Sequence, residues 1–157
     1  MSEHNEHARG VVATWLEHLA IGECLLVCFS TDVSVFPEDG TFLEVRGTAG
    51  AANRKRLLDA IEQTKPQDRT NTLLALETAY RYPNLDTVIL FTDGEPNSPT
   101  GGSNQFDSEI AERIHALCGK HGDIPVNTVG LGDYFKPKLS EFLIRVARET
   151  GGSFLGR

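Results

Sequence analysis

The sequence predicts an α/β protein with a doubly wound, three-layer sandwich fold, in which helices cover both faces of a mostly parallel sheet. Helix-like and strand-like patterns alternate along the chain, with no linker and no repeat. The strand-like segments are short and almost wholly apolar, as strands buried in parallel sheets are. With 157 residues, of which 39% are hydrophobic and 24% charged, the chain is expected to form one globular domain over residues 1–157.

The first part of the chain is expected to form a helix, two strands and a second helix. Apolar residues recur at helical spacing over 5–20, and residues 23–30 form a short apolar run that ends in polar turn residues. Residues 41–46 alternate between apolar and polar, which predicts a half-exposed edge strand. Because the connection is short, we expect this strand and 23–30 to form an antiparallel hairpin. A helix over 51–64 follows.

The rest of the chain alternates between helices and strands. Thr70 is expected to cap a helix that Pro83 ends. The elements expected after it are a strand, a helix, a strand, a helix that stops at Gly151-Gly152, and a short last strand, at 86–92, 105–119, 124–131, 138–150 and 153–155. Right-handed crossovers between these strands give a parallel sheet.

The charge and the cysteines limit the function classes. The chain has 15 Lys and Arg against 22 Asp and Glu, a net charge of −7, which disfavours nucleic acid or an anionic membrane as the partner. No apolar stretch approaches the roughly 18 residues of a membrane helix, and the polar N-terminus is unlike a signal peptide. Cys24, Cys28 and Cys118 are interpreted as small buried hydrophobes in a reducing compartment. The expected location is cytoplasmic.

Polar residues follow the predicted parallel strands where each strand ends. Ser30 and Asp32 follow the first strand, Asp93 follows the middle one and Asp133 the next, while Thr70 opens a helix that should face the same edge. Ligands bind at this edge in open α/β sheets. Hydroxyl and carboxylate oxygens suit Mg²⁺, Mn²⁺ or Ca²⁺. The alternative remains open that Thr70 is only a helix cap and that Asp93 belongs only to a turn.

Four segments resemble, in order and spacing, the von Willebrand factor type A domain, a Rossmann-like fold. They are RTNTLLALETAY (69–80), VILFTDGEPN (88–97), IPVNTVGLGD (124–133) and FLIRVARETGGSFLG (142–156). The resemblance implies a non-enzymatic domain that binds protein partners. It also implies a divalent cation in a metal-ion-dependent adhesion site, where a carboxylate of the partner often completes the coordination.

The matching motifs imply the site residues. Thr70 and Asp93 would be metal ligands, with Mg²⁺ as the expected cation and Mn²⁺ or Ca²⁺ as alternatives. Residues around them at the same edge are candidate contacts for the protein partner: Ser30, Asp32, Gly94, Glu95 and Asn97. The loop over 95–106 is the expected source of partner specificity, because loops at this edge carry function.

The chain departs from the family at its start. The family's first strand ends in Asp-x-Ser-x-Ser, but here little more than Met1-Ser2-Glu3-His4 precedes the first helix. Residues 32–36, DVSVF, lack the last serine and follow the wrong strand. We therefore expect Met1 to correspond to the methionine that follows this motif in many members. With about two of six ligands, the metal should bind weakly, on the order of 10⁻⁴–10⁻³ M, or not at all.

The missing strand is normally central in the family's sheet. Without it, the strand over 23–30 is expected to pair directly with 86–92, or a partner chain supplies a strand, or two exposed edges remain. A homo-oligomer or a strand exchanged with a partner chain is therefore a possible assembly. Two other functions remain open. One is a magnesium-dependent hydrolase or phosphotransferase with Asp93 as nucleophile or ligand, although no His, Cys or Lys is placed beside Asp93 by the sequence. The other is a structural domain without metal.

Overall fold

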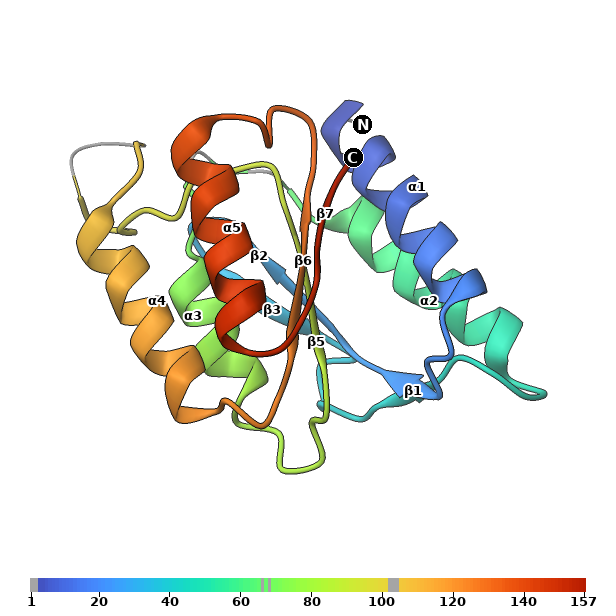
Figure 1. Ribbon diagram of the computed structural model, residues 1–157. Helices are drawn as coiled ribbons and strands as arrows, with labels where there is room; N and C mark the ends of the chain where they lie inside the picture. The colour runs from blue at the N-terminus through green and yellow to red at the C-terminus, as the bar shows by residue number, and fades with distance from the viewer. Residues whose placement is uncertain (1–2, 66, 68, 102–104) are drawn as a thin grey trace. The chain divides into compact units, whose positions relative to one another are not determined.

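The computed structural model describes residues 3–65, 67, 69–101 and 105–157, with side chains from residue 6 onward. The chain divides into two compact units. Unit 1 comprises residues 1–28 and 34–66, and unit 2 comprises residues 29–33 and 67–157. Figure 1 shows the helices and strands that form each unit. That residues 1–157 form a single domain remains a prediction.

Unit 1 contains a helix pair and a short antiparallel strand pair. Helix α1 (Glu3–His18) packs against α2 (Gly50–Gln63), and strand β1 (Glu23–Cys24) pairs antiparallel with β4 (Leu43–Glu44). The side chains that form its core are Leu16, Leu43, Val45 and Leu57, with half-buried neighbours such as Val12 and Leu58. The predicted antiparallel pairing is confirmed over a shorter length than expected. The two strands do not form a hairpin, however, because a second pair of strands lies between them in the chain.

A second pair of strands was not predicted. Strand β2 (Leu26–Phe29) pairs with β3 (Val33–Phe36), and the Ser30 amide donates a hydrogen bond to the carbonyl of Asp32 (2.9 Å) in the turn between them. The expected single strand over 23–30 is thus divided into β1 and β2. Val33 and Val35 are β-branched residues at alternating positions of β3, and such residues are favoured in strands. A tight turn closes this pair at a smaller entropy cost than pairing with a distant strand, which explains why β2 forms a hairpin.

Unit 2 carries the parallel sheet. Strands β5 (Val88–Thr92), β6 (Val126–Gly130) and β7 (Phe154–Gly156) lie parallel in this order, with Val88 opposite Val126 and Thr128 opposite Phe154. In Figure 1, its helices lie on one side of these strands, namely α3 (Thr72–Ala79), α4 (Ser108–Lys120) and α5 (Pro137–Glu149).

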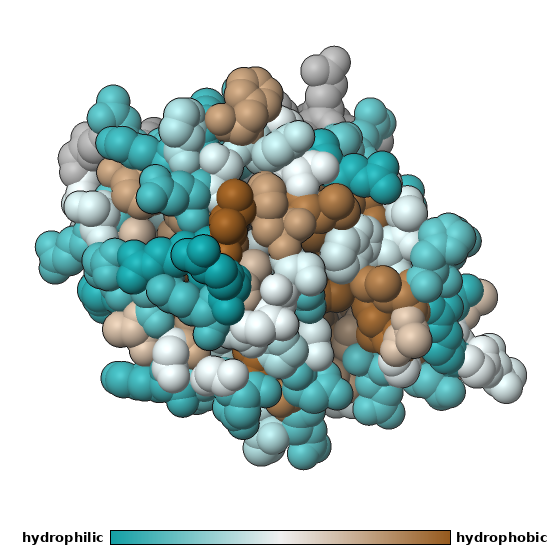
Figure 2. Space-filling model, in the orientation of Figure 1, coloured by the Kyte–Doolittle hydropathy of each residue, from teal (hydrophilic) through white to brown (hydrophobic). Residues whose placement is uncertain are grey.

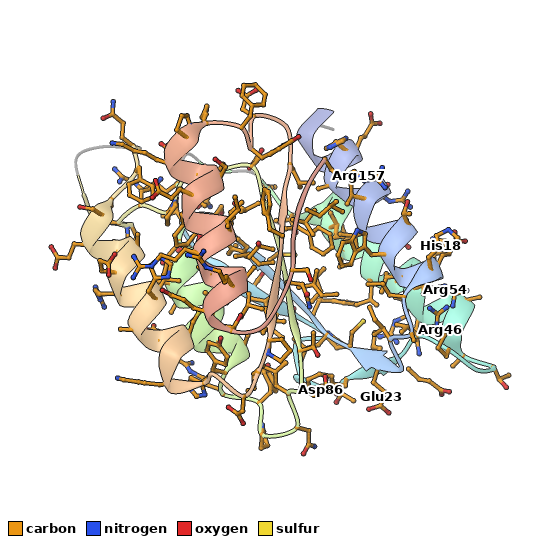
Figure 3. All side chains as sticks on the ribbon, viewed as in Figure 1. His18, Glu23, Arg46, Arg54, Asp86 and Arg157 are labelled. Atoms are coloured by element: carbon orange, nitrogen blue, oxygen red, sulfur yellow. The ribbon has the colours of Figure 1, made fainter. Side chains whose placement is uncertain are left out.

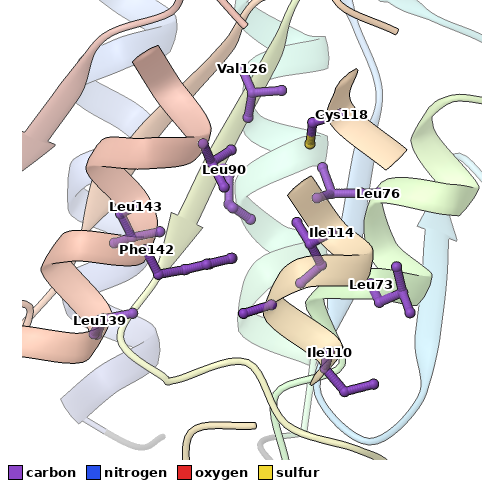
Figure 4. Packing of buried hydrophobic residues seen from close by; sticks show 12 residues of the cluster. Leu73, Leu76, Leu90, Ile110, Ile114, Cys118, Val126, Leu139, Phe142 and Leu143 are labelled. Carbon is purple, nitrogen blue, oxygen red and sulfur yellow. The ribbon is translucent and has the colours of Figure 1, made fainter. Parts of the chain in front are cut away.

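The core of unit 2 joins all three helices to the sheet. Figure 4 shows apolar side chains from α3, α4 and α5 converging on Leu90 of β5 and Val126 of β6. Leu139, Phe142 and Leu143 of α5 are 3% exposed or less, as the helical spacing predicts. After α5 the chain turns at Gly151, whose φ is +74°, a conformation that favours glycine. This confirms the predicted end of the helix.

The sheet arrangement differs in part from the prediction. The α/β character and the parallel sheet are confirmed, but the described strands form three separate sheets instead of one, and three strands are parallel. The predicted fold has a layer of helices on each face of the sheet. Because these helices come from both units, this layering remains a prediction. Among the described residues, no helix combines the length and the apolar character needed to cross a membrane.

Candidate functional site

The candidate site lies within unit 2, where β5 ends and α3 begins. A reciprocal pair of hydrogen bonds joins these two places. The Thr70 amide donates to Oδ1 of Asn97 (3.1 Å), and the Asn97 amide donates to the Thr70 carbonyl (3.2 Å). The Asn97 side chain, 3% exposed, also donates to the carbonyl of Glu95 (3.2 Å). We call this arrangement the Thr70–Asn97 clamp, because it holds the loop after β5 against the start of α3.

Gly94 brings the tip of β5 against the Thr70 side chain. A Cβ atom on Gly94 would overlap Oγ1 of Thr70 and would lie 3.2 Å from its Cβ and Cγ2. The Thr92 hydroxyl accepts a hydrogen bond from the Gly94 amide and donates one to the Gly94 carbonyl, both at 3.2 Å, which forms a tight turn. Asp93 is exposed in the middle of this turn. The structure therefore brings the Thr70 hydroxyl into contact with the residue that follows Asp93.

The helix cap is Asn71, and the expectation that Thr70 caps α3 is wrong. Oδ1 of Asn71 accepts a hydrogen bond from the Leu74 amide (3.3 Å). Its backbone amide donates to the Ser30 carbonyl (2.9 Å), and its Nδ2 donates to the Thr31 carbonyl (3.3 Å). The same residue thus caps the helix and ties it to the turn after β2. Asparagine is a preferred cap, but threonine is too, so the sequence Thr-Asn-Thr left the choice ambiguous.

The remaining predicted contacts take different positions. Ser30 is half-buried and takes part through its carbonyl, whereas Asp32 is exposed. The Glu95 carboxylate accepts a hydrogen bond from the Phe106 amide (3.2 Å), so it ties the loop to the segment before α4. Asn97 is buried in the clamp. Whether these residues and Gly94 contact a partner remains a prediction.

Asp133 lies after β6 at the same edge of the sheet. The Leu131 amide donates to the Thr92 carbonyl (2.8 Å), which places the turn after β6 beside the end of β5. The Asp133 carboxylate is exposed and lies 3.8 Å from Nζ of Lys136. The expected convergence of strand ends in unit 2 is therefore present.

The donor atoms fit a divalent cation by type but not by number. Thr70 and Asp93 offer a hydroxyl and a carboxylate oxygen, the hard donors that Mg²⁺ prefers. The described part of the chain contains no group of three or more His, Cys, Asp or Glu placed to hold a metal ion. In the same segment, the fully buried Thr72 hydroxyl has no hydrogen-bond partner among the described residues. A cation here would need most of its ligands from water or from a partner.

A cluster of charged side chains lies away from this edge, between α4 and α5. Arg145 pairs with Glu112 (2.6 Å) and with Glu149 (2.8 Å), and Glu149 also contacts Nδ1 of His115 (2.9 Å). Burial, and then the charge of Arg145, lower the pKa of His115. The ring is 7% exposed and stands edge-on to Phe142. The cluster fastens one helix to the other.

The three cysteines are free thiols. Cys118 is fully buried, and Cys24 and Cys28 are half-buried. Burial raises the pKa of Cys24 to about 11, and it raises the pKa values of the other two thiols as well. All three therefore remain protonated at neutral pH, in agreement with their interpretation as small hydrophobes.

The chain is similar to a human protein, von Willebrand factor A domain-containing protein 3B. The two are 29% identical over 119 residues, which make up 74% of this chain and 8% of the human protein. The chain thus spans a small part of the length of that relative. No family model matches the chain. The similarity indicates a distant relationship to a protein with von Willebrand factor A domains, in agreement with the resemblance of the four sequence segments.

Proposed function

We propose that the chain is a protein–protein interaction domain of the von Willebrand A type, and that it is not an enzyme. The observation that carries the proposal is the Thr70–Asn97 clamp, which holds the start of α3 against the loop after β5. Because Gly94 also touches the Thr70 side chain, Thr70 and the tip of β5 have a fixed mutual arrangement. Such a rigid support for an exposed loop is what a recognition site requires.

The proposed site takes a divalent cation, Mg²⁺ before Mn²⁺ or Ca²⁺. Thr70 and Asp93 would hold the ion, and a carboxylate of the partner would add to them. The ion would supply a positive charge at the tip of β5, so that an acidic group of the partner is attracted. With so few ligands from the chain, the affinity of the chain alone is expected to be low, with a dissociation constant on the order of 10⁻⁴–10⁻³ M.

The partner is proposed to contact the surface around Asp93. Asp32 is the most exposed of the other predicted contacts, whereas Ser30, Gly94 and Glu95 are half-buried. Asn97 is more buried still, so its proposed role is to shape the loop. We keep the cytoplasm as the proposed location and a doubly wound sandwich as the proposed arrangement of the whole chain.

Strand exchange or homo-oligomer formation is a related proposal. Among the described strands, β5 pairs only with β6, so it forms one edge of the sheet of unit 2. Its run of four apolar residues, VILF, is unusual for a strand at the edge of a sheet. A strand from a partner or from a second copy would extend the sheet at this side.

Affinity capture tests the proposed function. The immobilised chain is exposed to a lysate of its source cells with Mg²⁺ or with EDTA, and bound proteins are quantified by mass spectrometry. We expect a set of proteins that Asp93→Ala and Thr70→Ala each reduce several-fold. The matched control is Asp86→Ala, which removes an exposed carboxylate before β5. Asp86 precedes β5, so it lies at the other end of the parallel strands from the candidate site. Figure 3 shows it far from Arg157, which follows β7 at the end where the site lies.

Two results would contradict the proposal. One is that Asp93→Ala and Asp86→Ala reduce the amounts of the bound proteins equally. The other is turnover of phosphate esters or nucleotides, with Mg²⁺ or Mn²⁺ present, that Asp93→Ala abolishes. That second result would establish the hydrolase alternative.

A further inference from the structure

The connection between β6 and α5 is held rigidly at the same edge of unit 2 as the candidate site. Its first residue, Leu131, donates to the Thr92 carbonyl (2.8 Å), and the Gly132 amide donates to the carbonyl of Arg157 (3.1 Å). At its other end the Lys136 amide donates to the carbonyl of Asp133 (3.0 Å). Both neighbouring strands therefore fix this short loop, residues 131–136.

Tyr134 anchors the loop from inside. A Cβ atom on Gly130 would lie 2.5 Å from Cβ of Tyr134, and one on Gly156 would lie 2.8 Å from its Cδ2. The Tyr134 ring also meets Phe154 edge-on, with 6.3 Å between the ring centroids. Two glycines, one each on β6 and β7, thus leave the space that the tyrosine fills.

The next side chain, Phe135, is the most exposed of the large hydrophobic residues that the structure describes. It is 69% exposed, compared with 44% for Ile144 and 41% for Leu155. Figure 2 shows that scattered apolar residues are common on the surface of this protein, and exposure alone needs no explanation. Phe135 differs because its backbone is held in place, so a bulky aromatic side chain is presented to solvent with little freedom to withdraw. Aromatic residues, phenylalanine among them, are enriched at interfaces, and a pre-organised side chain loses little conformational freedom on binding.

Two lysines follow Phe135 in the sequence. Lys136 and Lys138 stand at the start of α5, where no acidic residue occurs in the first turn. Lys136 lies 3.8 Å from Asp133, whereas Lys138 forms no ion pair with any described residue and lies over the ring of Phe106. Cations at the start of a helix are unfavourably placed with respect to its dipole. Lys138 is therefore a cation that a carboxylate of a partner would stabilise.

We propose that Phe135, Lys136 and Lys138 form a docking surface for an acidic protein segment that carries an apolar side chain. Phe135 contacts the apolar side chain, and the lysines attract the neighbouring carboxylate. The inference rests on the proposed function only because it takes the partner to be a protein. It does not depend on a metal ion, and it assigns recognition to the β6–α5 loop in addition to the loop after β5.

Peptide selection tests this surface directly. A phage-displayed library of random dodecapeptides is selected on the immobilised chain in EDTA and counter-selected on the Phe135→Ala variant. We expect the recovered peptides to combine Asp or Glu with Leu, Phe or Trp. For a synthetic peptide of the recovered sequence, Phe135→Ala should weaken binding at least about tenfold. Lys138→Glu should weaken it as well, without harming the helix, because a carboxylate suits the start of α5.

The matched control is Ile144→Ala, which removes another exposed apolar side chain of unit 2. It should leave the peptide affinity within about twofold. The proposal is overturned if no peptide is recovered, if the recovered peptides are not acidic, or if Phe135→Ala and Ile144→Ala have equal effects. Binding that requires Mg²⁺ and Asp93 but is indifferent to Phe135 would overturn this inference and leave the proposed function standing.

Discussion

Gly94 determines how closely the tip of β5 can approach Thr70. Any side chain at this position would overlap the Thr70 hydroxyl and press on its Cβ and Cγ2. We predict that Gly94→Ala lowers the free energy of unfolding by about 1–3 kcal/mol, since the crowded atoms must separate. The measurement is urea denaturation followed by circular dichroism.

A second substitution shows whether Thr70 is the cause. In a Thr70→Ala background the Gly94→Ala change should cost about 1 kcal/mol less, because Oγ1 and Cγ2 are gone. Gly119→Ala is the control: a Cβ at Gly119 of α4 meets nothing within 4 Å, so this change should stabilise by about 0.5 kcal/mol. Additive effects of the changes at 70 and 94 would show that the contact does not exist.

At the scale of residues, the sequence predicted positions better than roles. The spacing placed Thr70 and Asp93 at one edge, and the structure brings their backbones together through Gly94 and Asn97. It did not show that Asn71 caps α3, because two good capping residues are adjacent. It also gave no signal for Phe135, because exposure depends on how Tyr134 is packed and not on the residue type.

The pairing of α4 with α5 depends on the protonation of His115. Burial, and then Arg145, lower the pKa of this ring in the folded protein from its ordinary value of 6.5, while Glu149 and Glu112 oppose the shift. Below pH 6.5 the unfolded chain therefore binds a proton more readily than the folded one, so the folded state loses stability as the pH falls toward the lowered pKa. Above pH 6.5 this contribution is fully present.

We predict that His115→Gln flattens the decline of stability as the pH falls below 6.5. At pH 7.5 the same change should cost about 1 kcal/mol, because a partly buried hydrogen bond to Glu149 is altered. Thermal or urea unfolding across this pH range provides the measurement. His18→Gln, an exposed histidine of α1, is the matched control and should retain the decline of the unmodified chain. An unchanged slope in His115→Gln would refute the assignment.

Among the elements, those with the clearest periodicity were predicted best. The buried face of α5 follows directly from its helical spacing, and β5 and β6 from their short apolar runs. Strand β3 was not predicted, because its four residues, VSVF, give too short an alternation to distinguish a strand from a connecting loop. The division of 23–30 into β1 and β2 depends on pairing with different partners, which local sequence does not encode.

At the scale of the whole molecule, the sequence predicted an α/β fold with a parallel sheet but not the grouping of strands into three sheets. Which strands pair is decided by competition between local hairpins and long crossovers, and a pattern of apolar residues is compatible with both. The candidate site is nevertheless contained in unit 2, so the proposed function depends on this unit alone. That function requires Thr70 and Asp93 to form one edge that takes a divalent cation.

The most direct test is a magnesium titration followed by the amide signals of the isotope-labelled chain in two-dimensional NMR. We predict saturable shifts confined to residues 70–72 and 93–97, with a dissociation constant on the order of 10⁻⁴–10⁻³ M. Asp93→Ala should remove them, and Asp86→Ala should not. Absence of shifts at magnesium concentrations about tenfold above that range, or equal shifts in the Asp93→Ala variant, would contradict the claim.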